Sequence, residues 1–353
     1  MAIHGSGTPI GFETIKDEFG LPPDKNIGYY RQTFSGNSEY GELTFNGISE
    51  GIPSSGAISF SDFYGKRLNI VVNYFSGGSE EKPQTARSRY VDQNVTVVGE
   101  LKSRPSDSSG SKVIIHVNKD IGSNKSSETS CALRTGSGWE AGTELQVDVG
   151  NEGRIFGAGG NGGNGSEGAG SGKNGKKGSS GLGIQFGTSS NKTVVNIAGG
   201  ALVTGGYGGG GGGGGGHDHD KNSERTASGG GGGGGAGFPA GTGGARGEGG
   251  NRGGAGGNGS KLLSGNGGSE SDNGNGEAEG GRGGHGGDFE RTANDPHESE
   301  DGEAGSGGEG SGGAGGERGG DGEGIRVTGA SNTVTINNSG TLRKGISYNV
   351  SVT

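Results

Sequence analysis

Glycine recurs at every third position over long stretches of this chain, from Gly241 to Gly259 and again from Gly307 to Gly322. A period of three fits neither an α-helix nor a β-strand. It is the period of the polyproline-II conformation, which has about 9 Å per turn, no internal hydrogen bonds, and room for close approach at a strict glycine position. We therefore expect these stretches to lie side by side and to form lateral hydrogen bonds.

Two other glycine-rich structures fit the sequence less well. A flexible linker needs no fixed glycine phase, and collagen needs abundant proline at the other two positions. The chain has 94 glycines but only 8 prolines in 353 residues, and its triplets are interrupted repeatedly. The pattern predicts a bundle of short polyglycine-II helices from one chain over residues 151–324. Gly241–Gly259 would span about 60 Å if it were one straight segment.

Polar stretches interrupt the glycine pattern at three places. They are 217–228 (HDHDKNSERTAS), 260–273, and 288–301 (DFERTANDPHESED). Charged, turn-forming residues of variable number are typical of exposed loops. We expect these stretches to be loops at the ends of a stiff rod.

The remaining sequence predicts β-structure. Hydrophobic residues make up only 24% of the chain, well below the roughly 45–50% of ordinary globular domains, so a large core over the whole length is excluded. Short β-branched or alternating runs predict a small antiparallel β-sandwich over 68–150, with strands at 68–75, 95–98, 112–117 and 144–149. Residues 183–186 and 193–197 predict a hairpin, and the strands of 325–353 are expected to close the bundle. The predicted fold class is mainly β.

The first 67 residues contain a loose repeat. Residues 9–15 and 57–63 each place apolar side chains at matching positions, which predicts an extended segment followed by one helical turn. Such turns make poor cores alone but can insert into a larger partner. The second copy supplies the candidate docking residues Ile58, Phe60, Asp62, Phe63 and Tyr64. The alternative interpretation is a small cap on the β-domain.

Several function classes find no support. The formal net charge of −9 argues against a nucleic-acid surface, although three Arg-Gly-Gly triplets leave a salt-sensitive RNA binder as an alternative. Gly157–Gly162 matches a dinucleotide fingerprint in form, but glycine follows where a helix should begin. Alternating His and Asp at 217–220 would point to opposite sides of an extended chain, so we expect no metal site. We expect no enzymatic activity, catalytic residues or cofactor. The sequence shows no signal peptide or membrane span, so we expect synthesis in a cytoplasm.

Two short motifs carry a family resemblance. Residues 132–143 (ALRTGSGWEAGT), followed by 153–163 (GRIFGAGGNGG), resemble a module recurrent in tail proteins of tailed bacteriophages. Residues 51–66 (GIPSSGAISFSDFYGK) resemble an element near the start of phage tail and virion proteins. The glycine pattern is similar to that of the distal tail-fibre adhesins of T-even-like phages, whose polyglycine-II domains display loops that bind outer-membrane receptors. The loops of this chain are acidic, whereas those of the adhesins are rich in aromatic residues.

The resemblance implies a protein of the virion tail, synthesised in the host cytoplasm. In the first hypothesis it is an adhesin with other tail proteins and a bacterial surface receptor as partners, and a trimer is compatible with it. The N-terminal segment docks onto the virion and the loops contact the receptor. The candidate contact residues are His217, Asp218, His219, Asp220, Phe289, Asp295 and His297. In the second hypothesis the chain is a structural component of tail, neck or capsid.

Overall fold

The computed structural model describes residues 7–19, 26–28, 53, 55–66, 70–74, 112–123, 129–135, 143–187, 193–220, 223–249, 251–272, 278–289, 299–307, 312–328, 334–344 and 351–352. Over these residues the chain is mainly β, as predicted, with the one α-helix α1 (Phe12–Phe19) and the 3-10 helix η3 (Phe60–Phe63). Neither of these helices, nor any other in the described ranges, is long and apolar enough to cross a membrane.

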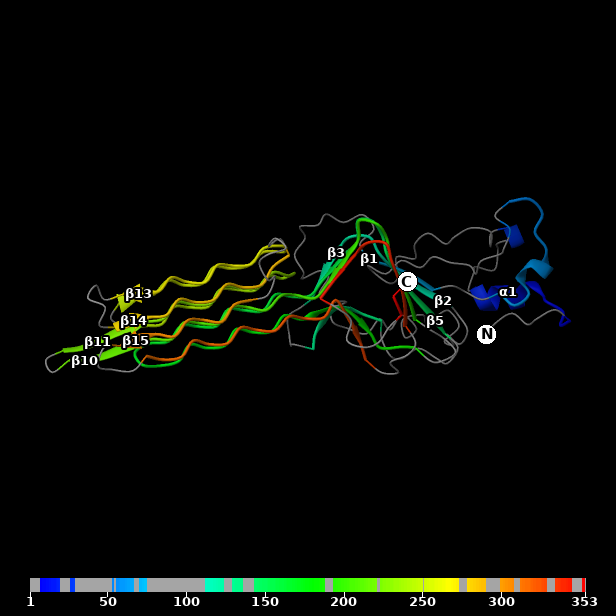
Figure 1. The fold of residues 1–353 in the computed structure, drawn as a ribbon. Helices are drawn as coiled ribbons and strands as arrows, with labels where there is room; N and C mark the ends of the chain where they lie inside the picture. Colours follow the sequence, from blue (N-terminus) through cyan, green and yellow to red (C-terminus); the bar gives the residue numbers. More distant parts are fainter. Residues whose placement is uncertain are drawn as a thin grey trace.

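The molecule is elongated and has three parts (Figure 1). The N-terminal helical unit, with α1 and η3, lies at one end. A body of parallel β-strands lies in the middle, and a long glycine-rich rod extends from it to the opposite end. We call the end of the rod at the β-body its base and the far end its tip.

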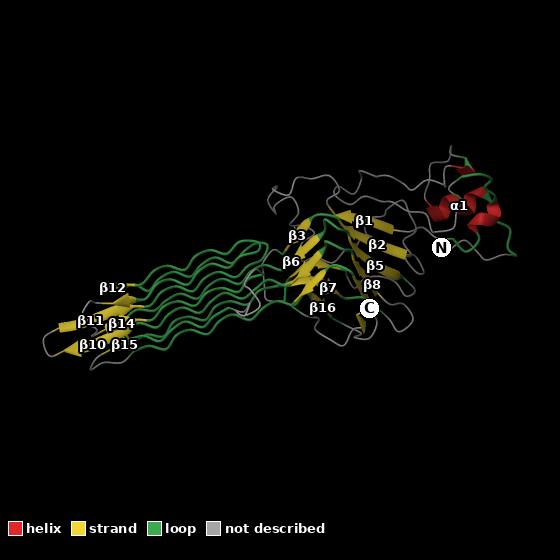
Figure 2. Ribbon diagram, turned by 45° about the horizontal axis from the view of Figure 1, so that its top comes forward, coloured by secondary structure: helices red, strands yellow, loops and turns green. Residues whose placement is uncertain are grey.

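The β-body is built from three parallel sheets through which the chain passes in turn. The first sheet has the order β1-β2-β5-β8-β17-β19, the second β18-β9-β6-β3 and the third β16-β7-β4. Because successive strands of the body from β2 onward enter different sheets, the chain coils as a three-sided parallel β-helix (Figure 2). The first sheet contains β1 (Ile70–Tyr74), β2 (Lys112–Val117), β5 (Glu144–Val149), β8 (Thr193–Ile197), β17 (Val334–Asn338) and β19 (Ser351–Val352). The other two contain β3 (Asp120–Gly122), β6 (Arg154–Phe156), β9 (Leu202–Thr204) and β18 (Thr341–Arg343), and β4 (Cys131–Arg134), β7 (Ser180–Ile184) and β16 (Ile325–Val327).

Aliphatic residues stack from coil to coil inside the β-helix. In the first sheet Ile115 is in register with Val147, which is in register with Val195 and then Ile336. All four are buried in the same apolar cluster as the inward residues of the other two sheets, such as Ile155 and Leu182. Alternation along each strand puts every second side chain inside, which is why these short β-branched runs suffice for a core.

The predicted antiparallel sandwich over 68–150 is wrong. The pairs β1·β2, β2·β5 and β3·β6 are all parallel. From β2 to β5 and from β5 to β8 the chain passes through the other two sheets before it returns, so these strands run in the same direction, and strands from 325–353 join the same sheets. The predicted hairpin at 183–197 is also wrong, because β7 and β8 belong to different sheets. The predicted strand at 95–98 lies outside the described residues.

The rod consists of two insertions at one corner of the β-helix. In the first coil, residues 123–130 connect β3 to β4. At the same corner of the next coil, residues 157–179 run out and back between β6 and β7. In the following coil, residues 205–324 separate β9 from β16. The β-helix therefore anchors the rod at both ends of both insertions.

The uninterrupted run 208–215 lies at the centre of the rod. Successive amides of this run donate to carbonyls of three different segments in turn. Gly209 and Gly212 donate to Lys176 and Lys173. Gly210 and Gly213 donate to Gly233 and Gly230, and Gly211 and Gly214 donate to Glu300 and Glu303. The N–O distances are 2.8–3.0 Å. Its carbonyls accept from three further segments, with donors at Gly163, Gly284 and Gly316 among others. The run thus has six hydrogen-bonded neighbours.

The second uninterrupted run, 229–235, is the other central segment. Its amides and carbonyls likewise bond to surrounding segments on all sides, including 208–215. The outer segments bond to one another in a closed ring around these two. Following the ring, they are 157–166, 170–179, 312–324, 299–307, 281–287, 264–270, 253–259 and 240–249, and the last bonds to the first.

Glycine content follows position in this arrangement. A Cβ at Gly211, Gly212 or Gly213 would overlap a backbone carbonyl of a neighbouring segment, so no residue of the central run can carry a side chain. An outer segment needs glycine where it faces a central run, as at Gly172, and also where it faces a neighbouring outer segment, as at Gly163 and Gly319. Gly241–Gly259 is not one 60 Å segment: the chain turns back at β12 (Asn251–Arg252), and the triplet phase continues through the turn.

A pair of glycine substitutions tests this account. Gly212→Ala places a methyl group against the carbonyl of Asn164, whereas Gly320→Ala meets nothing nearer than the Lys177 side chain at 3.9 Å. Because overpacking typically costs 1–3 kcal/mol and here only backbone can move, we expect Gly212→Ala to lower the free energy of unfolding by at least about 3 kcal/mol. Gly320→Ala should change it by less than about 1 kcal/mol. Denaturant unfolding of both variants measures this, and equal effects would contradict the packing described.

Candidate functional site: the two ends of the rod

The tip of the rod is made of two small sheets. In the first, β10 (Gly216–Asp220) and β11 (Ser223–Ser228) form an antiparallel hairpin, and β12 pairs with β11. In the second, β14 (Ala278–Gly280) lies between β13 (Ser271–Asp272) and β15 (Ser306–Gly307). Strands β10 and β11 contact β14, so the two sheets lie against each other. Both continue directly from segments of the rod (Figure 2).

Small and polar residues fill the space between these sheets. Ala227, Ser228 and Ala278 are fully buried, and the Ser271 hydroxyl donates to the Ser228 carbonyl at 2.8 Å. Asp218 is 5% exposed and is in register with Arg225 across the hairpin. The tip is therefore held by backbone pairing and close packing of small residues, without an apolar core.

The predicted contact residues His217, Asp218, His219 and Asp220 all belong to β10. Their backbone lies at the tip, as expected for an end loop. His217 is half-buried and Asp218 is buried, so Asp218 supports the hairpin and offers little surface. The side chains of His219 and Asp220 lie outside the described part. Among described residues, no group of three His, Cys, Asp or Glu side chains could hold a metal ion.

The exposed side chains at the tip are polar. Arg252, Asp272, Glu279 and Ser306 are exposed, and the sequences 216–228, 251–252, 271–280 and 305–312 contain no aromatic residue and no Val, Leu, Ile or Met. A partly open pocket of about 250 Å³ lies at the tip. Its lining includes Glu270, Ser271, Asp272, Glu279, Glu303 and Ser306.

The base of the rod carries an aromatic cluster instead. Phe156 ends β6, Tyr207 follows β9, and both pack with Phe289 and Phe238 where the chain passes from the β-helix into the rod. The Tyr207 and Phe289 ring centroids are 4.6 Å apart at 76°, and Phe156 meets Phe289 edge-on at 6.1 Å. Such edge-to-face pairs add about 0.5–1.5 kcal/mol each to the burial of the rings.

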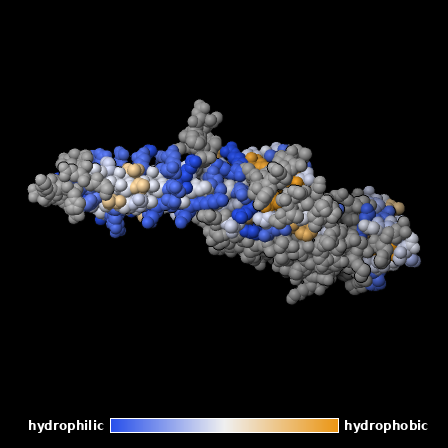
Figure 3. All heavy atoms as spheres, turned by 60° about the horizontal axis from the view of Figure 1, so that its bottom comes forward, coloured by the Kyte–Doolittle hydropathy of each residue, from blue (hydrophilic) through white to orange (hydrophobic). Residues whose placement is uncertain are grey.

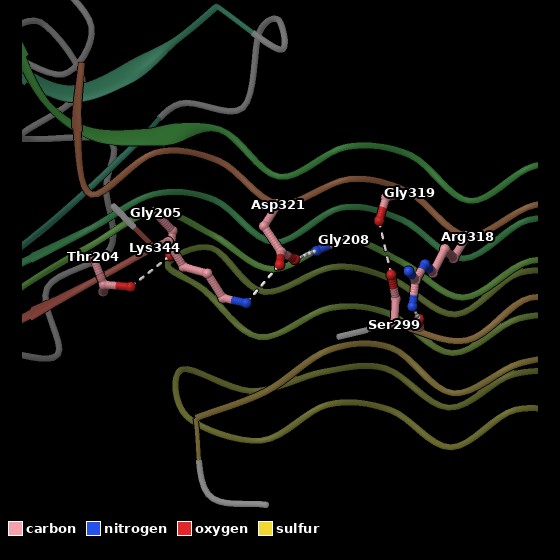
Figure 4. Close-up of polar contacts among 8 residues, drawn as sticks. All are labelled: Thr204, Gly205, Gly208, Ser299, Arg318, Gly319, Asp321 and Lys344. Atoms are coloured by element: carbon pink, nitrogen blue, oxygen red, sulfur yellow. Dashed lines mark hydrogen bonds and ion pairs between the residues drawn. The ribbon is translucent and has the colours of Figure 1, made fainter. Parts of the chain in front are cut away.

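Cations cover this cluster and join it to the rod. The Lys344 ammonium lies 4.3 Å from the Tyr207 ring centroid and 2.6 Å from an Asp321 carboxylate oxygen, whose other oxygen accepts from the Gly208 amide at 2.8 Å (Figure 4). Nearby, the Ser299 hydroxyl donates to the Gly319 carbonyl (Figure 4). Lys261 lies over Phe238 and bonds to buried Asp120 at 2.7 Å.

Two predicted positions need correction. Phe289 is not in an exposed loop: it is 6% exposed and packs in the base cluster. The stretch 288–301 therefore leaves and re-enters the rod near its base, since Ser299 bonds to Gly319 there, and not at the tip. Apolar burial at the junction positions Phe289. Asp295 and His297 lie outside the described residues.

The candidate docking residues lie at the opposite end of the molecule from the tip (Figure 1). Ser59 and Asp62 form a capping box that starts η3, with the Ser59 amide donating to the Asp62 carboxylate at 2.7 Å. Phe63 is fully buried, as is Ile15 at the matching position of the repeat. Ile58 and Tyr64 are half-buried, whereas Phe60 is 43% exposed. The repeat thus buries its last apolar residue in both copies and leaves Phe60 on the surface.

Comparisons with known proteins give one weak neighbour. No protein-family model and no curated protein matches the chain. Among solved structures, the chain is similar to the gp37-gp38 adhesin tip complex of the bacteriophage S16 long tail fibre, with a TM-score of 0.34 and 16% sequence identity. The match covers 86% of this chain and 90% of that chain.

The base cluster makes a prediction about pH. Burial raises the pKa of Tyr207 to about 12, against the counteracting effect of Arg343. Between about pH 10 and pH 12 the unfolded chain therefore loses this proton while the folded chain keeps it, so stability falls as pH rises through that range. We expect Tyr207→Phe to remove this part of the fall, measured by unfolding at pH 9, 10.5 and 12. An identical pH dependence in both proteins would show that Tyr207 ionises freely in the fold.

Proposed function

We propose that the chain is a bacteriophage tail protein that acts as a receptor-binding adhesin. The rod is a polyglycine-II bundle that holds the tip sheets away from the rest of the virion, and the N-terminal unit docks onto another tail protein through Phe60 and its neighbours. The observation that carries the proposal is the geometry: a long rod separates the N-terminal unit from a tip whose exposed side chains, such as Arg252 and Asp272, are polar (Figure 1).

The chemistry at the two ends of the rod supports this division. Turns at the base contain Phe238, Phe289 and their cationic partners, which hold the rod to the β-helix. Turns at the tip contain only small, polar and charged residues. Substitutions at the tip that leave the glycine segments unchanged would therefore alter what the protein contacts without disturbing the hydrogen bonds of the rod.

A second candidate function is a structural one, in which the rod is a spacer or decoration of tail, neck or capsid. The observation that favours it is the absence of aromatic and large aliphatic side chains from the tip sequences, because aromatic residues dominate most binding hot spots. Both functions place the protein in the virion and neither requires enzymatic activity.

Cell binding distinguishes the two functions. Purified, fluorescently labelled protein is titrated onto intact candidate host cells together with two loop variants. One replaces residues 219–224 at the tip with a Gly-Ser sequence of equal length, and the other replaces 290–298, which is connected to the base. We expect saturable binding that the tip variant loses and the base variant keeps, since only the first change removes the contact surface.

Thermal unfolding of both variants provides the folding control. Binding lost only in the base variant would contradict the assignment of the tip as the contact surface. If the native protein fails to bind cells that the phage infects, the structural function replaces the adhesin function.

A further inference from the structure

The perimeter of the rod separates inward from outward positions. In segment 170–179 a Cβ at Gly172 or Gly175 would overlap a carbonyl of the central run. The residues Lys173, Lys176 and Lys177 of this segment are exposed. In the adjacent segment 312–324 a Cβ at Gly316 or Gly319 would overlap a carbonyl of segment 170–179, and Glu317 and Arg318 are exposed. Hydrophilic residues cover much of the visible side of the rod (Figure 3).

A glycine arrangement of this kind has no boundary of its own. Each central segment bonds to six neighbours, and an outer segment keeps donors and acceptors on its outward side, as the edge strand of a sheet does. A further glycine segment, such as an outer segment of a second copy's rod, could bond to these outward groups. To do so its backbone would have to reach the N–O distances of 2.8–3.0 Å found inside the rod. Inside, that approach requires glycine on the facing side.

Side chains also occupy backbone donors between outer segments. The Asn164 amide oxygen accepts from the Ala245 amide at 3.0 Å, Asn174 accepts from Glu317 at 3.0 Å, and Asn258 accepts from Gly243 at 2.9 Å. These bonds tie neighbouring perimeter segments together. They also use donors that an added segment would need.

We propose that the perimeter side chains close the rod against lateral addition of a second copy. Their bulk keeps another rod from reaching hydrogen-bonding distance. The outer surface of the rod could otherwise bind a second rod of the same kind, and the side chains block this along the whole length of the surface. Removing side chains from one side converts that side into an open edge.

A matched pair of variants tests the proposal. In the first, Lys173, Lys176, Lys177 and Glu317 are all changed to Gly; in the second, the same four are changed to Gln. Both variants have the same net charge, and Asn174 is kept in both. Light scattering coupled to size exclusion, over a hundredfold range of protein concentration, gives the mass. We expect the Gly variant to associate with rising concentration and the Gln variant to keep the mass of the native protein.

Circular dichroism melts show whether both variants are folded. A folded Gly variant that keeps the native mass at every concentration would overturn the proposal. Association of both variants would also overturn it, because charge and not bulk would then block addition. If the Gly variant does not fold, a milder pair of variants is used. Lys173 and Lys176, which lie on successive helical turns of one segment, are both changed to Gly in one variant and to Gln in the other, and their masses are compared in the same way.

Discussion

The structure depends on one interaction, the lateral hydrogen bond between extended glycine segments at 2.8–3.0 Å. Extended segments of this kind have no internal bonds, so every buried amide must find a partner on a neighbouring segment. That approach leaves no space for a Cβ, as the carbonyl facing Gly212 shows. Each such bond contributes only about 0.5–1.5 kcal/mol, but the rod repeats it along every segment. The stability of the rod thus comes from backbone bonding with very little apolar burial.

The base and the tip of the rod are stabilised in different ways. The β-helix supplies the apolar core and anchors both glycine insertions at one corner. The aromatic cluster around Tyr207 and Phe289, with Lys344 and Asp321, connects that core to the first turns of the rod. At the tip, backbone pairing is combined with an interior of small and polar residues such as Ala227, Ala278 and Asp218. Exposed tip side chains such as Arg252 and Glu279 are the candidates for contacts with other molecules.

The lateral packing and the mainly β class could be predicted from the sequence, because glycine phase and β-branched runs are local signals. The parallel β-helix could not, since short strands such as 112–117 and 144–149 look the same in parallel and antiparallel sheets and the partner is a full coil away. The position of 288–301 was predicted at the wrong end. A usable signal existed: Phe156, Tyr207, Phe238 and Phe289 each stand at the border of a glycine segment, and all four lie at the base of the rod. Polar borders, such as 217–228, are the tip turns.

Residue-resolved amide hydrogen exchange tests the central claim most directly. The account predicts strong protection of every amide from Gly209 to Gly215 and from Gly229 to Gly235. In an outer segment such as 170–179 it predicts a repeating pattern, with Gly172, Lys173, Gly175 and Lys176 protected and the Asn174 and Lys177 amides exchanging faster. Uniformly fast exchange across 205–249 would contradict it, because the glycine segments would then be a flexible tract without lateral bonds.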